Sequence, residues 1–424
     1  MENKFLPKKS DYSGLRIGFK SDLIAGITVG IVALPLAIAF GITTGTGAAS
    51  GLITAIIAGF IAAIFGGSNY QVSGPTGAMT VVLVPIVSKF GISTLVPLGI
   101  FAGLIVCSFG LLKLGSLISK VPWPVMEGFT FGIALVIALQ QIPSALAVQG
   151  VKGNGTLGSA YNTIRFAFNH GLNWKSIFVV LLTLLIKFSY APISKKLRFK
   201  FYLPASFVTI ILVTILVYFL NIKVPLVGEL PRNIFRISTL KYPSSITSLI
   251  VPAIEISLLA AIESLLSARL ADGMARKHLD FQSYDPNREL FGQGLATGIS
   301  SIFGGMPGTG AIARSGVNVR AGAKTRAAAA IHSVFLLCAI LFFNPLIAHI
   351  PTPALAGVLI GTSYRIARPS VIMEALTTNW ISGVTLVITA MIVLVVDLIW
   401  GIVIGCVIYF VLNKINSKKI QSGR

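Results

Sequence analysis

The stretch GGMPGTGAIARSG, residues 304–316, lies between two long apolar segments and interrupts their helical pattern with glycines and a proline. It ends by placing an arginine, Arg314, among small and apolar residues. Proline is favoured in the first turn of a helix, where the missing amide hydrogen is not needed, so Pro307 predicts a helix start. This stretch therefore predicts a helix that begins within the apolar part of the protein.

The composition indicates a membrane protein, because 54% of the 424 residues are hydrophobic and only 11% are charged. Runs such as 23–42 and 381–396 approach the roughly 20 apolar residues that cross a bilayer as a helix. The first residues are polar and are not followed by the cleavage site of a signal peptide, so the first helix is expected to act as the membrane-insertion signal. The formal charge of +21 lies in short clusters at the ends of apolar runs, which argues against nucleic-acid binding.

Apolar runs separated by glycines, prolines and charged residues divide the chain into fourteen helical segments. We place them near residues 22–42, 48–66, 74–88, 94–112, 123–142, 173–191, 203–220, 247–270, 287–303, 308–320, 326–346, 353–367, 380–396 and 398–414. With both termini cytoplasmic, most of the 34 lysines and arginines fall on the cytoplasmic side, as the positive-inside rule expects. The sequence thus predicts an all-α polytopic protein of the plasma, or inner, membrane.

The two halves of the chain contain similar motifs. The third segment opens SGPTGA at residues 73–78, and the tenth opens MPGTGA at residues 306–311. Fourteen segments divide into seven plus seven, and an odd number per half gives the halves opposite orientations, as in many secondary transporters. The predicted repeats span 22–220 and 247–414, between a cytoplasmic segment 1–21 and a tail 415–424. A chance match of common membrane residues is the alternative.

Pro75 and Pro307 both predict helices that start within the membrane. A helix start carries about half a positive charge and several amides without partners, so two starts that meet form a site for an anion. Small residues keep the backbone approachable there; they are Gly74, Gly77, Ala78, Gly308, Gly310, Ala311 and Ala313. The alternative is that these small residues only permit close helix packing.

Arg314 and Glu263 are the conspicuous charges inside predicted spans. A charged residue at the centre of a membrane helix costs about 2.5 to 3.5 kcal/mol on insertion scales, so it must face protein, water or a ligand. The two could form a purely structural ion pair. Since a buried ion pair rarely stabilises a protein more than apolar packing does, we interpret Arg314 and Glu263 as functional residues. Protonation of Glu263 would leave Arg314 and the helix starts uncompensated and so favour an anion, which is a route to proton coupling.

An ordered set of motifs resembles the SulP family of anion transporters and covers nearly the whole chain. The motifs are DLIAGITVGIVALPLA at 22–37, VSGPTGAMT at 72–80, ESLLSARLADGM at 263–274, and Arg314 followed by VNVRAG at 317–322. The resemblance implies two inverted seven-helix repeats that form a core domain, from segments one to four and eight to eleven, and a gate domain from the others. It also implies elevator-like movement, a homodimer, no cofactor and no enzymatic activity.

The resemblance implies a site as well, for sulfate, bicarbonate, chloride or a small dicarboxylate, between the starts of segments three and ten. The implied anion-binding residues are Leu36, Phe40, Ser73, Thr76, Gly77, Ala78, Thr309, Gly310, Ala311, Ile312, Ala313 and Arg314. Leu36 stands where many members have glutamine. Glu263 and Ser267 match a pair that binds sodium in bicarbonate-transporting relatives, but Ile312 replaces the threonine of that site, which favours protons as the coupling ion.

The preferred hypothesis is a proton-coupled anion symporter. The alternatives are an anion channel or prestin-like voltage-responsive protein, a sodium-coupled symporter, and a nucleobase carrier. Members of the family usually continue into a cytoplasmic STAS domain, whereas this chain stops at Arg424. The domain is expected to be either removed or naturally absent, and its loss would weaken a dimer contact. No metal site is predicted.

Overall fold

The computed structural model describes residues 5–12, 14–118, 121–148, 151, 153, 155–196, 203–230, 237, 246–276 and 283–422. The elements before residue 230 are η1 (Lys9–Tyr12), α1 (Leu15–Thr43), α2 (Ala48–Ile53), η2 (Thr54–Ala58), α3 (Gly59–Phe65), β1 (Ser73–Gly74), α4 (Gly77–Phe90), η3 (Ile92–Thr94), α5 (Leu95–Leu111), α6 (Gly115–Ile118), α7 (Trp123–Gln140), α8 (Ile142–Leu146), α9 (Gly155–His170), α10 (Trp174–Lys196) and α11 (Ala205–Phe219). Those after it are η4 (Ile246–Leu249), α12 (Ile250–Ala275), α13 (Pro286–Ile302), β2 (Thr309–Gly310), α14 (Ile312–Arg320), α15 (Ala327–Ala348), α16 (Thr352–Ala367), α17 (Pro369–Thr378), α18 (Trp380–Val395) and α19 (Leu398–Ser422).

The all-helical fold class is confirmed, and eight of the described helices are long and apolar enough to cross a membrane. Several boundaries differ from the prediction. α1 begins at Leu15 instead of residue 22, and α19 continues to Ser422, through the predicted tail. The prediction ended each segment at its charged residues, whereas a helix continues beyond the bilayer wherever its backbone bonds are satisfied. α9 and α17 were not predicted, because neither contains a long apolar run.

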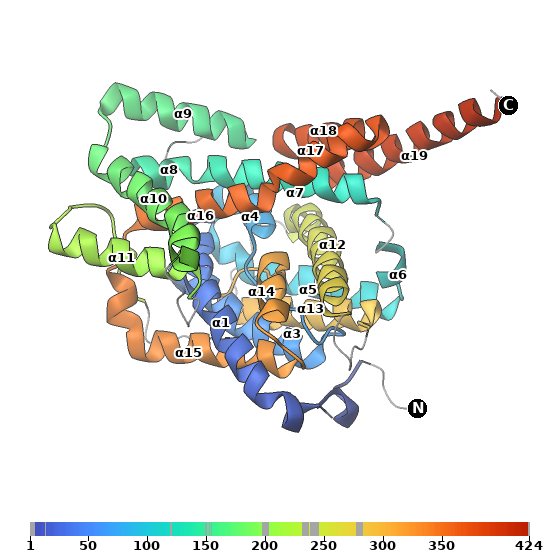
Figure 1. Ribbon diagram of the computed structural model, residues 1–424, viewed down its shortest axis with the longest axis horizontal. Helices are drawn as coiled ribbons and strands as arrows, with labels where there is room; N and C mark the ends of the chain where they lie inside the picture. Colours follow the sequence, from blue (N-terminus) through green and yellow to red (C-terminus); the bar gives the residue numbers. More distant parts are fainter. Residues whose placement is uncertain are drawn as a thin grey trace.

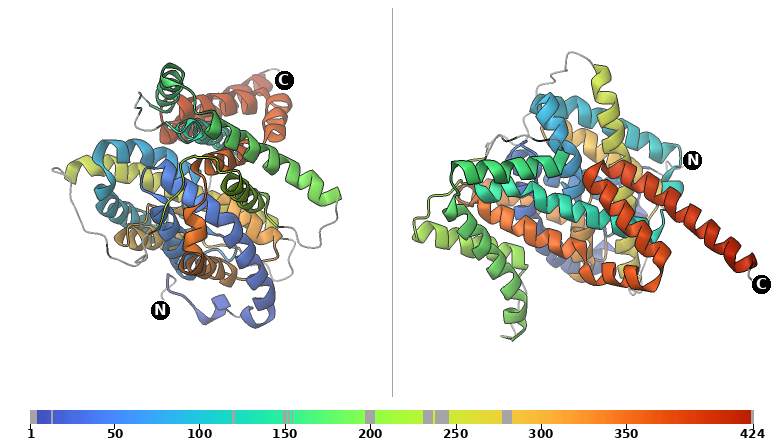
Figure 2. Two further views of the ribbon diagram at one scale, coloured as in Figure 1. Left: turned by 90° about the vertical axis from the view of Figure 1, so that its left-hand side faces the viewer. Right: turned by 90° about the horizontal axis from the view of Figure 1, so that it is seen from above.

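The helices pack in two groups (Figure 1). In one group α1 lies against α15, α5 against α13, and α12 against α14. In the other α7 lies against α18 and α16, α10 against α16, and α18 against α19. The second group, with α9, occupies mainly the upper part of Figure 1, and the left view of Figure 2 again places α9 and the red C-terminal helices at the top. Contacts of α16 with α1 and of α4 with α7 join the two groups.

The first group is tightly packed because glycines let its helices approach closely. A Cβ atom on Gly103 of α5 would lie 2.7 Å from the carbonyl oxygen of Gly294 on α13, closer than real Cβ contacts occur. Small residues at helix contacts are typical of membrane bundles, where close approach brings van der Waals contact between backbones. The α5–α13 pair is therefore a rigid support for the elements that lie against it.

The N-terminal segment is fastened to this first group by Asp11. Both carboxylate oxygens of Asp11 accept hydrogen bonds from the guanidinium of Arg288 on α13, at 3.0 and 2.6 Å, and Arg326 lies 3.6 Å away. Burial alone raises the pKa of Asp11, but the bonds from Arg288 and from the Lys8 amide, with the charge of Arg326, lower it below the ordinary value of 3.8. Asp11 therefore links the N-terminus to α13 and to the start of α15.

We expect Asp11→Asn to destabilise the folded protein at neutral pH by about 1.5 to 3 kcal/mol, the range for hydrogen bonds to charged groups. Because the folded-state pKa of Asp11 lies below the unfolded value, its contribution is complete above about pH 4 and is lost as pH falls through the folded-state pKa. The difference in melting temperature between wild type and variant in detergent should thus persist at pH 5 to 7 and shrink below pH 4. A difference that does not change with pH would contradict this role.

Candidate functional site

Two short strands hold the interrupted segments together. Ser73 pairs with Gly310 and Gly74 with Thr309 in an antiparallel ladder, which the amide of Ala311 extends by donating to the Val72 carbonyl at 2.9 Å. β1 leads directly into α4 and β2 directly into α14. The two helix starts therefore lie beside one another, as the sequence predicts.

The prolines do not occupy the first turns that were predicted for them. α4 begins at Gly77 and α14 at Ile312, after the N-cap residues Thr76 and Ala311. Pro75 precedes the N-cap of α4, and Pro307 lies before β2. The backbone between each proline and its helix is extended because it forms the strand pair, so the helices start later than the prolines alone suggest.

Several amides at the two helix starts have no recorded acceptor within the described parts of the chain. At α4 the Thr76 hydroxyl accepts from the Met79 amide at 3.3 Å, which leaves the amides of Gly77 and Ala78. α14 has no side-chain cap at all, which leaves the amides of Ile312, Ala313 and Arg314. Unpaired amides at adjoining helix starts favour negative charge between them.

Arg314 joins the two halves of the site. Its side chain is 2% exposed, and its Nη2 donates to the Pro75 carbonyl at 2.8 Å. Its Nη1 is buried and has no hydrogen-bond partner among the described residues. The guanidinium lies against Gly74, where φ is +150° and a Cβ atom would sit 2.7 Å from Nη1. Glycine is thus required at 74 both by the backbone conformation and by the arginine.

Glu263 of α12 is also buried, at 8% exposed, but it does not pair directly with Arg314. Its Oε2 accepts hydrogen bonds from the hydroxyls of Thr76, at 2.8 Å, and Thr309, at 2.6 Å, which lie 3.0 Å from each other. No Glu263–Arg314 contact occurs among the ion pairs within 4.0 Å in the described residues. The ion pair that was the structural alternative does not occur in this conformation, and the Glu263 carboxylate has two threonine partners instead.

Other predicted site residues support the strand pair. The Ser73 hydroxyl donates to Gln293 at 2.8 Å, and the Ser267 hydroxyl lies 3.0 Å from that of Ser315, which accepts from the Val72 amide. Ser267 is thus not a partner of Glu263 in this conformation. The Gly310 amide donates to the hydroxyl of Ser264 at 3.0 Å.

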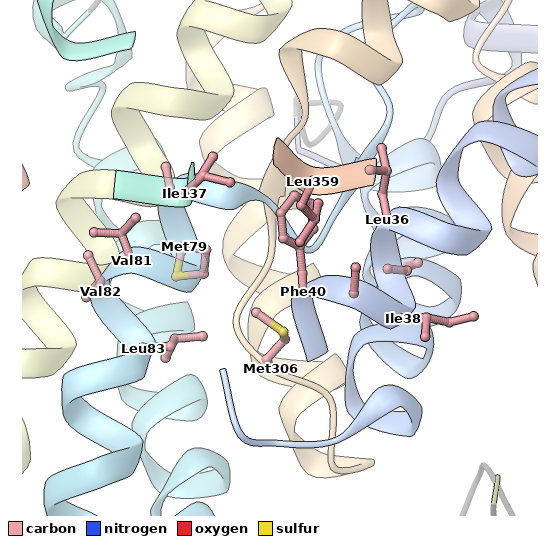
Figure 3. Packing of buried hydrophobic residues seen from close by; sticks show 14 of the residues in the cluster. Leu36, Ile38, Phe40, Met79, Val81, Val82, Leu83, Ile137, Met306 and Leu359 are labelled. Atoms are coloured by element: carbon pink, nitrogen blue, oxygen red, sulfur yellow. The ribbon is translucent and has the colours of Figure 1, made fainter. Parts of the chain in front are cut away.

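Apolar residues close one side of the site. Phe40 of α1 lies near the start of α4, since a Cβ atom on Gly77 would be 3.6 Å from its ring. Figure 3 shows the ring pointing toward Leu359 of α16, with Leu36 on a neighbouring turn of α1. Both Phe40 and Leu36 are buried. The structure therefore brings both predicted residues of α1 to the same apolar region.

Sequence reasoning missed the residues that hold the turn before β2. Gln293 and Thr297, one turn apart on α13, both donate to the Gly308 carbonyl at 3.0 Å. Thr54, in the π-helical turn η2, bonds both the amide and the carbonyl of Met306. Polar residues at i and i+4 within an apolar run are the signal that could have found the first two.

Known proteins resemble this chain over most of its length. The model of the family described as "Sulfate permease family" matches residues 19–389. The "Putative sulfate transporter YvdB" of Bacillus subtilis (strain 168) is 34% identical over 401 residues, covering 93% of this chain and 73% of that protein. The "Bicarbonate transporter BicA" of Picosynechococcus sp. is 29% identical, covering 95% of this chain and 72% of that protein.

Solved structures give the same result. The chain superposes on the transmembrane domain of a cyanobacterium bicarbonate transporter BicA with a TM-score of 0.79 and 27% identity, covering 96% of this chain and 100% of that one. The structure titled SLC26A9 has a TM-score of 0.80, covers 94% of this chain and 66% of that one, and at 15% identity shows the fold alone. A family match over most of the chain, with a relative at 34% identity, shows that this chain belongs to the sulfate permease family.

Proposed function

We propose that this protein is a secondary transporter that binds a small anion between the starts of α4 and α14. The sulfate permease family is a family of transporters, and the relatives named above are described as sulfate or bicarbonate transporters. The observation that carries the proposal is Arg314, whose Nη1 is buried and has no hydrogen-bond partner among the described residues, beside the start of α14, which has no side-chain cap. An anion would satisfy this nitrogen and the nearby amides together.

The proposal divides the predicted residues into two roles. The backbone amides of Gly77, Ala78, Ile312 and Ala313, with the Arg314 guanidinium, contact the anion. Phe40 and Leu36 exclude water from one side. The remaining predicted residues position these groups; they are Ser73, Thr76, Thr309, Gly310, Ala311 and Ser267. A site made largely of amides and one arginine recognises charge more strongly than shape, so it suits inorganic anions and small dicarboxylates alike.

Glu263 is proposed to carry the coupling proton. While ionised, it accepts from Thr76 and Thr309 and opposes a second negative charge nearby. When protonated, it donates one hydrogen bond and removes that repulsion, so the anion and the proton bind together. Since Ser267 lies against Ser315 and not against Glu263, a sodium site of the expected type is not favoured.

The proposed transport cycle moves one helix group against the other. We assign α1–α5 and α12–α15 to the core, and α7–α11 and α16–α19 to the gate, in two inverted repeats of seven segments. The antiparallel β1–β2 pair, from which α4 and α14 both start, supports this arrangement. At α14 Ala313 is exposed, whereas Gly77 and Ala78 of α4 are buried, so the anion is expected to reach the site along α14 in this conformation.

Arg314→Ala should weaken binding of sulfate and bicarbonate about ten- to a hundredfold, the loss expected for hydrogen bonds from a charged donor. Calorimetry on detergent-purified protein measures this directly. Arg165→Ala, which removes an exposed arginine from α9, is the charge-matched control and should bind normally. Because a cavity could disturb folding, Arg314→Lys is a second variant, and both must elute as monodisperse protein. Unchanged binding by folded Arg314→Ala protein would refute the site.

Glu263→Gln should abolish anion accumulation driven by an imposed pH gradient in proteoliposomes, because the amide cannot take up and release the proton. Anion exchange at equal pH should continue. Glu255→Gln, two turns earlier on α12, is the matched control and should keep pH-driven uptake. If the Glu263 variant still accumulates anion like the wild type, the proton is carried elsewhere. If anion uptake by the wild-type protein does not depend on the pH gradient, the result would favour an anion channel.

A further inference from the structure

One face of α14 is accessible from the start of the helix to its end. Ala313 and Arg320 are exposed and Val317 is half-buried, at positions i, i+7 and i+4, which share a helix face. Arg314, one residue from Ala313, is buried. The accessible face thus extends about 10 Å along the helix, from Arg320 to the start of α14.

The side chain of Arg320 lies back along this helix toward its start. A Cβ atom placed on Gly316, one turn earlier, would be 3.4 Å from Nη1 and 3.6 Å from Nη2 of Arg320. The same point is 3.7 Å from the sulfur of Met274 on α12. The guanidinium of Arg320 therefore lies beside Gly316 of α14, and Met274 of α12 approaches the same point.

A role in capping the helix does not account for this position. The last carbonyls of α14 already accept backbone hydrogen bonds, Val317 from Ala321, Asn318 from Ala323 and Val319 from Gly322. The Arg320 guanidinium instead extends toward the start of the helix. Within the described residues, no hydrogen bond or ion pair is recorded for it.

The charged groups nearest to this position along α12 are mostly basic. Arg269 and Arg276 are exposed, and Lys324 is exposed four residues beyond Arg320. The carboxylate of Asp272 is buried and accepts from the Tyr284 amide at 2.8 Å and from the Ser283 hydroxyl at 3.5 Å. The exposed charged residues in this set are therefore all basic, and an anion that approaches the accessible face of α14 meets Arg320 on that face.

We propose that Arg320 forms a second, outer anion-binding site, which captures the transported anion at the end of α14 before it reaches Arg314. This proposal rests on the anion site described above and adds an entrance to it. The guanidinium offers several donors to one anion, and its position on the same face as Ala313 gives the anion a direct path along the helix. It explains why the arginine lies beside Gly316 with no hydrogen-bond or ion-pair partner among the described residues.

The test measures the local charge at the start of α14. Cys107, Cys338 and Cys406 are replaced by alanine, and Ala313→Cys introduces one thiol on the accessible face. The rates of modification by an anionic and a cationic methanethiosulfonate reagent are compared in detergent, where both sides of the protein are open. We expect Arg320→Gln to lower the ratio of anionic to cationic rates on the order of fivefold, as loss of one nearby charge predicts.

Two further variants are matched controls. Arg320→Lys keeps the charge and should retain most of the ratio, and Lys324→Gln removes a charge farther along the chain and should change the ratio less than twofold. Gel filtration confirms that each variant is folded. An unchanged ratio in Arg320→Gln, or an equal fall in Lys324→Gln, would overturn the proposal.

Sulfate protection separates this inference from the proposed function. One result is that added sulfate slows modification of the introduced thiol while Arg320→Gln leaves the ratio of anionic to cationic rates unchanged. This result would support the inner site beside Arg314 and refute the outer site. If the ratio depends on Arg320 while sulfate gives no protection even at high concentration, the charged entrance is supported and the anion site beside Arg314 fails.

Discussion

The hydrogen bond from Arg314 to the Pro75 carbonyl is the contact on which the rest of the site depends. It joins the helix α14 to the non-helical backbone at Pro75, more than two hundred residues away in the sequence. Non-helical backbone persists within a membrane only when protein or a wet cavity satisfies its polar groups. Here the β1–β2 ladder forms hydrogen bonds with part of that backbone. The Arg314 guanidinium donates to the Pro75 carbonyl, which lies outside the ladder. The same contact therefore stabilises the interruption and places a positive charge beside it.

A layer of buried polar side chains makes this arrangement specific. Thr54, Gln293 and Thr297 hold the turn before β2, while Ser264 and Ser315 hold amides next to the strand pair. Each bond to a backbone group fixes one position of a segment that lacks helical bonds of its own. The free amides of Ile312 and Ala313 are consequently held in place before any ligand arrives, which reduces the cost of ordering them on binding.

The sequence predicts the location of the site better than its internal contacts. Proline, glycine and Arg314 indicate where the helical pattern stops, because each conflicts with an uninterrupted membrane helix. The partners of Thr76 and Thr309 could not be predicted, since a hydroxyl can point to an anion or to Glu263 with equal ease. α9 was missed for a related reason: its buried residues are Ala160, Thr163 and Ala167, and small residues with intervening polar ones give no apolar run.

In the proposed mechanism, the separation of Glu263 from Arg314 lets one site respond both to a proton and to an anion. A direct ion pair would cancel both charges, and an incoming anion would have to break it at a cost in buried electrostatic energy. The carboxylate is hydrogen-bonded to Thr76 and Thr309 instead of to the guanidinium, and Nη1 of Arg314 has no hydrogen-bond partner among the described residues. The two charges still act on each other through a medium of low dielectric constant, where their interaction is weakly screened. In the proposed mechanism, a change in the charge of Glu263 therefore alters the electrostatic energy of Arg314 directly.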